Sequence, residues 1–194
     1  MKTAARRWST LPPLAALISL LALSGCGTPT DSPGMRLDAV ETLQLRSWVP
    51  PALKGQVLLA SVSGGQPTGM FWGSKISNPA LQEAIDESLR GLGLVPYSPG
   101  MPGTGRYQLN VKLVELEQPM VGLDIKVAVT LEYSLLDKET EGKVAYQRRL
   151  RTLHTANFSE AVFDQNTRTR IASEAAVRKN VNTMVREWMA MSWN

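Results

Sequence analysis

Residues 121–134, which read VGLDIKVAVTLEYS, carry the most regular pattern in this sequence of 194 residues. Every odd-numbered position is apolar or aromatic, and every even-numbered position is small or polar. Successive side chains of a β-strand point to opposite faces of a sheet, so this alternation predicts a strand with one buried face. The side chains that we expect to face the core are Val121, Leu123, Ile125, Val127, Val129, Leu131 and Tyr133.

Three further segments have the pattern of strands. Residues 107–113 alternate in the same way, and residues 143–155 resume an apolar pattern after the polar turn DKETEG at 137–142. Together with the segment at 121–134 they predict an antiparallel meander of three strands. Residues 57–62 (VLLASV) form a short apolar run between glycines, which predicts a strand covered on both faces.

Two segments have the periodicity of amphipathic helices. The first begins at Asn78, whose side chain is expected to cap the helix ahead of Pro79, and stops at Gly91 or Gly93. Its apolar stripe is Leu81, Ile85, Leu89 and Leu92. The second begins at about residue 159 and runs close to the end of the chain. Its stripe is Val177, Val181, Met184, Trp188 and Met191, whereas residues 164–169 interrupt the pattern and predict a break or a solvated first half.

This order of elements indicates the fold class. A helix with one apolar stripe must bury it against another element, and the long strands offer a sheet with one apolar face. We therefore predict a two-layer α+β domain, in which a mostly antiparallel sheet carries both helices on one face.

The first 25 residues have the composition of a secretory signal. Lys2, Arg6 and Arg7 precede an apolar run at residues 11–23, and two small residues then lead to Cys26. A transmembrane anchor is the alternative, but the apolar run is shorter than the roughly 20 residues that a spanning helix needs.

The stretch Leu23-Ser24-Gly25-Cys26 resembles the lipobox of bacterial lipoproteins. This resemblance implies cleavage before Cys26, attachment of lipid to its thiol and amine, and membrane anchorage through that lipid. Gly27 occupies the position where that family has Asp as an inner-membrane retention signal. It therefore implies an address on the periplasmic face of the outer membrane.

The lipobox divides the chain into three parts. Residues 1–25 would be the signal peptide, residues 26–36 a lipidated flexible tether rich in Gly, Pro, Ser and Thr, and residues 37–194 a periplasmic α+β domain. Removing the signal takes away three of the 21 Lys and Arg residues, which leaves 18 against 17 acidic residues. The mature charge of +1 gives no reason to expect a nucleic-acid partner.

Residues that could support catalysis or metal binding are sparse. His154 is the only histidine and Cys26 the only cysteine, so we expect no metal site, no cofactor and no enzymatic activity. Glu115 and Glu117 share one strand face, where a solvated surface is the interpretation favoured over a catalytic carboxylate pair. Trp188 is expected in the core, and Trp193 either frays or touches a partner.

One concentrated cationic patch remains, at Arg148, Arg149 and Arg151. On a strand, residues 149 and 151 point one way and residue 148 the other, so two guanidinium groups could bind an anionic lipid headgroup or a phosphorylated sugar. The favoured alternative is an edge strand whose charges prevent aggregation.

The segments GG at 64–65, FWGSKISN at 71–78 and LQEAIDESLRGLGL at 81–94, followed by the strand pair at 107–133, resemble uncharacterised proteobacterial envelope lipoproteins. More distantly, the order of elements is similar to YajG-type lipoproteins and the auxiliary lipoproteins of lipid-transporting ABC systems. The resemblance implies a non-enzymatic accessory in envelope assembly or transport, which binds a protein complex or lipid. The alternatives are a carrier with an apolar ligand pocket between sheet and helices and, less favoured, a hydrolase.

Replacing Cys26 with Ser tests the lipobox. The variant lacks the thiol that accepts the lipid, so we expect an uncut precursor or a soluble periplasmic form in place of the anchored protein. Cell fractionation combined with radiolabelled palmitate incorporation measures both properties. A cleaved product that stays in the membrane fraction would refute the lipobox.

Overall fold

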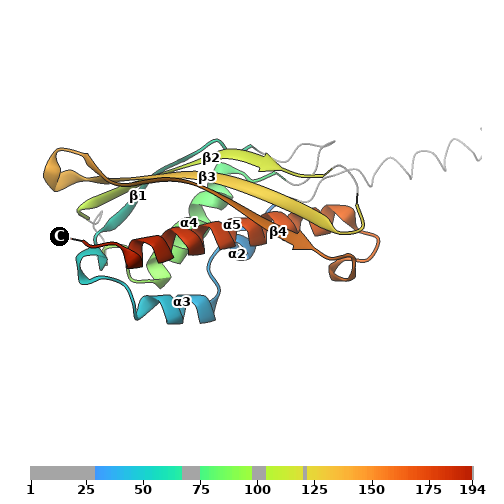
Figure 1. Ribbon diagram of the computed structural model, residues 1–194, viewed down its shortest axis with the longest axis horizontal. Coiled ribbons are helices and arrows are strands. Elements are labelled where there is room, and N and C mark those ends of the chain that lie inside the picture. Colours follow the sequence, from blue (N-terminus) through green and yellow to red (C-terminus); the bar gives the residue numbers. More distant parts are fainter. Residues whose placement is uncertain (1–28, 67–74, 98–103, 120–121, 194) are drawn as a thin grey trace, which may run out of the picture.

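The computed structural model describes residues 29–66, 75–97, 104–119 and 122–193 (Figure 1). Its strands are β1 Val57–Ser63, β2 Tyr107–Glu117, β3 Ile125–Asp137 and β4 Lys143–Ala156. Its α-helices are α2 Ser32–Met35, α3 Ala39–Arg46, α4 Asn78–Gly91 and α5 Gln165–Ala190. Short 3-10 helices occur at Pro51–Leu53, Lys138–Thr140 and Phe158–Glu160.

The four strands form one sheet in the order β1-β2-β3-β4. Strands β2, β3 and β4 pair antiparallel, which confirms the predicted meander, and β1 pairs parallel to β2. The prediction that β1 is covered on both faces is wrong. It lies at the edge of the sheet, and α4 packs against only one of its faces, so Val57 is buried whereas Ala60 and Ser61 are exposed.

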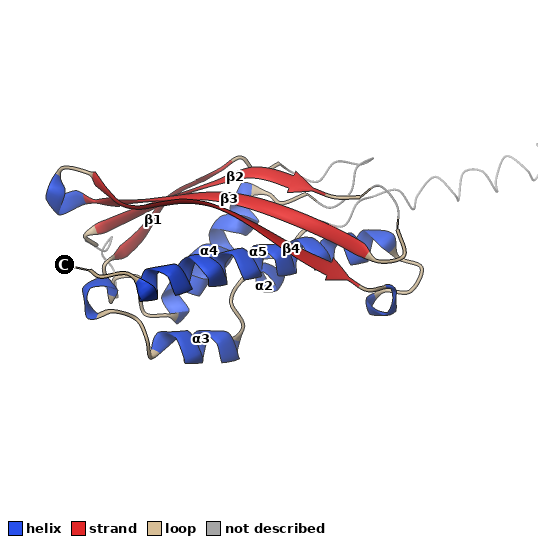
Figure 2. Cartoon of the chain, in the orientation of Figure 1, coloured by secondary structure: helices blue, strands red, loops and turns tan. Residues whose placement is uncertain are grey.

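Both long helices pack on the same face of this sheet, α4 against β1 and α5 against β3 and β4 (Figure 2). The two-layer α+β prediction is therefore confirmed. In β3 the residues predicted to face inward are fully buried from Ile125 to Tyr133. Leu123 departs from the prediction because it precedes the strand and is 73% exposed. Val121 lies outside the described residues, as do the first four residues of the FWGSKISN segment, 71–74.

The start of α4 differs by one residue from the prediction. The cap is Ser77, whose hydroxyl accepts a hydrogen bond from the Ala80 amide, and Pro79 lies in the first turn as expected. The Asn78 side chain instead accepts a 2.7 Å hydrogen bond from the Gly65 amide. It thereby joins the helix start to the chain that leaves β1.

Helix α5 starts later than predicted. Asp164 caps it by accepting a 2.9 Å hydrogen bond from the Thr167 amide. The break predicted at residues 164–169 therefore corresponds to the start of the helix. The first half is not solvated, since Ala172 and Ser173 are fully buried. The predicted stripe is buried from Val177 to Trp188, while Met191 follows the end of the helix and is 36% exposed.

The segment just before α3 belongs to the folded domain. Met35 is fully buried, the Asp31 amide donates a 2.8 Å hydrogen bond to Glu174, and Arg178 donates to the Gly34 carbonyl. A residue larger than Gly34 would collide with the Glu174 side chain. The ordered domain thus includes residues from about 30 onward, so the predicted flexible tether of residues 26–36 is too long at its C-terminal end.

A buried polar network fastens α5 to the sheet. Asn180 is fully buried, and its amide oxygen accepts a 2.9 Å hydrogen bond from the Tyr133 hydroxyl of β3. Its amide nitrogen donates to the Leu150 carbonyl at 2.8 Å and to the Thr152 hydroxyl at 3.0 Å, both on β4. Burial raises the pKa of Tyr133 well above its usual value, so its hydroxyl stays protonated as a donor.

A second polar contact ties the start of β2 to the end of β3. The Arg106 guanidinium donates to both carboxylate oxygens of Asp137, with distances between 2.7 and 3.1 Å. These hydrogen bonds are the main cause that lowers the pKa of Asp137. The pair stands next to the register position where Tyr107 lies opposite Asp137, so it marks the end of the β2 and β3 ladder.

Replacing Asn180 with Ala should lower the free energy of unfolding by about 2–4 kcal/mol. The variant leaves the Tyr133 hydroxyl buried without its acceptor and removes the donor to β4. Urea titration of this variant, of Tyr133→Phe and of the double variant measures the coupling. We expect the double variant to lose less than the sum of the single losses by about 1 kcal/mol, and additive losses would contradict the network.

The Arg106–Asp137 pair predicts a pH dependence of stability. The folded state lowers the pKa of Asp137, so its stabilising contribution is complete above the unfolded pKa of about 4 and is lost as the pH falls through the folded value. The stability difference between the natural protein and Asp137→Asn should therefore be constant near neutral pH and shrink in acid. Unfolding titrations across this range test it, and a difference that persists unchanged in acid would count against the pair.

Candidate functional site

The predicted cationic patch lies on β4 and is matched by acidic residues. Arg149 contacts Glu132 of β3 at 2.7 Å, and Arg151 bonds both carboxylate oxygens of Glu117 of β2 at 2.9 and 3.0 Å. Both arginines belong to the open face of the sheet. Arg148 belongs to the helix-covered face, where its Nε lies 3.6 Å from Glu187 of α5.

These ion pairs change what the patch can bind. Exposed pairs of this kind contribute about 0.2–1 kcal/mol each, so they can be exchanged for other partners. An anionic headgroup would nevertheless have to displace Glu132 or Glu117 from its guanidinium group. An open groove of about 340 Å³ runs beside Arg151, between Glu117 and Lys126, with Ala128 in its lining. The binding of an anion or lipid headgroup here stays a prediction.

The other predicted residues do not converge on this patch. His154 is half-buried on β4, opposite Val127 of β3, on the side of the sheet that the helices cover. Glu115 and Glu117 share the open face, as expected, but Glu117 pairs with Arg151, whereas Glu115 lines a separate cavity near the end of β1. Among the described residues, no cluster of three His, Cys, Asp or Glu side chains is placed to hold a metal ion.

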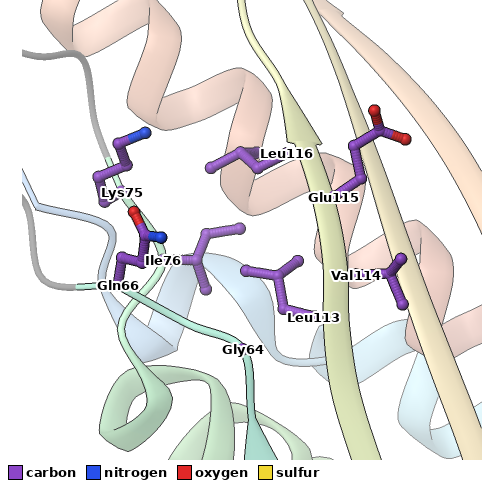
Figure 3. Close-up of a pocket in the computed structure, with 8 residues that line it drawn as sticks. All are labelled: Gly64, Gln66, Lys75, Ile76, Leu113, Val114, Glu115 and Leu116. Atoms are coloured by element: carbon purple, nitrogen blue, oxygen red, sulfur yellow. The ribbon is translucent and has the colours of Figure 1, made fainter.

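A small cavity forms where β1 ends and β2 continues (Figure 3). Its volume is about 170 Å³, and its walls come from Ile76, Leu113 and Leu116, with Gln66 and Lys75 at one side. The β1 pairing stops at Ser63 opposite Lys112, so the following residues of β2 have no described strand on this side. The cavity volume is below the roughly 300–1,000 Å³ of ligand pockets. An open strand edge is better suited to pairing with the backbone of an extended peptide than to binding a small molecule.

The space between the sheet and the helices is filled by side chains. Tyr133, Leu131 and Trp188 are at most 1% exposed in this layer, and Trp188 meets the Tyr146 ring edge-on at 5.8 Å. Trp188 therefore lies in the core as predicted. Trp193 is half-buried and packs edge-on against Tyr107 at 5.5 Å. The described part of this layer offers no support for the alternative of an apolar ligand pocket.

The surface of α3 carries apolar residues that the sequence analysis did not single out. Leu45 and Glu41 hold the helix to the domain, Leu45 by burial and Glu41 through a 2.9 Å hydrogen bond from Asn182. Val40 and Leu43 are one helical turn apart on the outer side, 65% and 71% exposed. Trp48, just beyond the helix, is 66% exposed. The helix therefore has apolar residues on both sides, with Leu45 buried against the domain and Val40 and Leu43 exposed.

Within the described ranges, no helix combines the length and the apolarity that are needed to cross a bilayer. Anchorage through Cys26 concerns a residue outside these ranges and stays a prediction.

Comparisons with known proteins give similarities of fold. No protein-family model matches the sequence, and no curated protein matches it. A crystal structure from Xanthomonas campestris, of the family DUF330, is 14% identical and has a TM-score of 0.51, covering 72% of this chain and 86% of that one. A protein from Caulobacter crescentus is also 14% identical, with a TM-score of 0.45 over 76% of this chain and 93% of that one. A minor lipoprotein from Acinetobacter baumannii is 11% identical, with a TM-score of 0.40 over 69% of this chain and 93% of that one.

The likeness to YajG-type and ABC-auxiliary lipoproteins stays a prediction. At these identities the comparison concerns the fold alone, and the chain shares the α+β fold of the Xanthomonas DUF330 protein.

Proposed function

We propose that this protein is a lipid-anchored envelope lipoprotein on the periplasmic face of the outer membrane, where it acts as a non-enzymatic accessory in assembly or transport. The lipobox at Leu23-Ser24-Gly25-Cys26 supports the anchor, and Gly27 supports the outer-membrane address. The described part of the domain begins at residue 29, three positions after Cys26. The lipid would therefore hold the domain close to the membrane surface.

The observation that carries the accessory function is the outer face of α3. Val40, Leu43 and Trp48 expose large apolar side chains on a domain whose sheet and helix layers are well packed. In Figure 1, α3 lies outside the layer formed by α4 and α5, on the side away from the sheet. Exposed apolar residues grouped in this way mark interaction surfaces, and an aromatic residue among them is typical of an interface centre. We therefore place the partner protein on α3.

The variant Val40→Asp/Leu43→Asp tests this surface. Both side chains are exposed, so the fold should survive, while two carboxylates at the interface should reduce recovery of the bound partner about tenfold or more. The measurement is quantitative mass spectrometry of proteins that copurify from solubilised membranes. Val144→Asp, which changes an apolar residue that is 48% exposed on β4, is the matched control.

Loss of the same proteins from both variants, or from neither, would contradict a partner site on α3. Circular dichroism and a urea titration of each variant separate loss of binding from loss of structure.

A further inference from the structure

One end of the domain presents apolar side chains that no described residue covers. Leu123, Val162 and Phe163 are 73%, 52% and 92% exposed. They come from two loops, one leading into β3 and one leading into α5. In Figure 1 both loops lie at the same end of the sheet, beyond the last residues of β4. We call these three residues, with Phe158 beneath them, the apolar tip.

Polar contacts hold the two loops of the apolar tip together. The Phe158 amide donates a 3.0 Å hydrogen bond to Asp124 across the loops. The guanidinium group of Arg168, a residue only 4% exposed, donates to the Ala161 carbonyl in one loop and the Gly122 carbonyl in the other. It also lies over the Phe158 ring, 5.2 Å from its centroid. The Arg168 guanidinium group thus lies inside the tip, whereas Leu123, Val162 and Phe163 remain exposed on its outside.

Phe163 combines a strained backbone with an exposed ring. Its φ of +62° lies in the left-handed region, which bulky residues rarely adopt and which costs about 1–3 kcal/mol. Its ring has one aromatic contact, an edge-on approach to Phe158 at 5.8 Å, and is otherwise open. A strained backbone that holds a phenyl ring in the open is a feature of binding sites. Contact with an apolar environment outside the chain would offset the strain.

The position of the N-terminal segment indicates which environment this is. Asp31 is fixed to Glu174, which lies nine residues into α5 and so about 14 Å along the helix from its start beside the apolar tip. Cys26 precedes Asp31 by five residues, a span of about 18 Å at most. The lipid on Cys26 and the apolar tip can therefore reach the same plane. The remaining 16 residues of α5 extend about 24 Å beyond Glu174 in the opposite direction.

We propose that the apolar tip inserts into the interfacial region of the bilayer that holds the lipid of Cys26, as a second membrane contact made by the protein itself. This inference rests on the proposed lipid anchor. Leu and Phe side chains favour the boundary between headgroups and acyl chains. The occupant is the bilayer, and the domain then stands with the C-terminal end of α5 farthest from the membrane.

The charges around the tip indicate how this contact depends on lipid. Asp124, Glu160 and Asp164 surround it, and each accepts a hydrogen bond from a backbone amide of the same region. Hydrogen bonds from Thr167 lower the pKa of Asp164, which therefore stays ionised. These carboxylates repel anionic headgroups. Insertion should occur in zwitterionic vesicles, and neither anionic lipid nor low salt should strengthen it.

The test places a tryptophan at the tip of the full-length lipidated protein. Phe163→Trp and, as a second reporter, Leu123→Trp are reconstituted into vesicles of phosphatidylcholine brominated on its acyl chains. We expect the bromine atoms to quench the added tryptophan, and its emission to shift to shorter wavelength, relative to the natural protein. Val144→Trp, at the opposite end of β4, is the control and should show no added quenching.

Vesicle flotation in the same samples separates this inference from the proposed anchor. Protein that fails to float would overturn the anchor, and the inference with it. Protein that floats without added quenching at positions 163 and 123 would overturn the inference alone. Emission that shifts in native membranes but not in protein-free vesicles would assign the tip to a protein partner and would likewise overturn it.

Discussion

The buried amide of Asn180 is the contact on which the arrangement of this domain depends. It joins α5 to Tyr133 of β3 and to the backbone of β4, and so fixes the rotation of the helix about its own axis. A buried amide is satisfied in one orientation only, whereas the apolar residues around it would tolerate small rotations. Once the rotation is set, the direction of every other side chain on α5 is set with it.

The orientation of α5 directs three of its residues, spaced six positions apart, toward three different parts of the domain. Six residues turn an α-helix by about 240° beyond one full turn, so Arg168, Glu174 and Asn180 point in three directions around the axis. Asn180 meets the sheet, Glu174 meets the N-terminal segment, and Arg168 meets the two loops of the apolar tip. One helix thus positions the sheet, the chain that leads to the lipid, and the proposed membrane contact.

The sequence predicted those parts of the fold that depend on local periodicity. The alternation from Ile125 to Tyr133 and the stripe from Val177 to Trp188 were sufficient to place the sheet and the last helix in two layers. The sequence could not show that Met35 is buried or that Glu174 binds the Asp31 amide. The residues around Asp31 have a composition typical of a flexible tether, and their partners lie far away in the sequence. The ion pairs of the cationic patch could not be predicted for the same reason, because Glu132 and Glu117 reach the arginines only through the register of neighbouring strands. Leu123 fits the alternation, yet the strand begins two residues later, and the apolar tip appears only when two loops are brought together.

The bond between Asp31 and Glu174 spans 143 residues, and Trp193 returns to the Tyr107 ring at the start of β2. Contacts of such wide sequence separation form late, because closing the intervening loop costs entropy that nearer contacts do not. The sheet hairpins and α4 can form from neighbouring segments as the chain appears, whereas the N-terminal segment contacts both α4 and α5, so its docking site is complete only once α5 is in place. We therefore expect folding of this domain to finish when its last helix docks, because only then does Glu174 become available to the Asp31 amide.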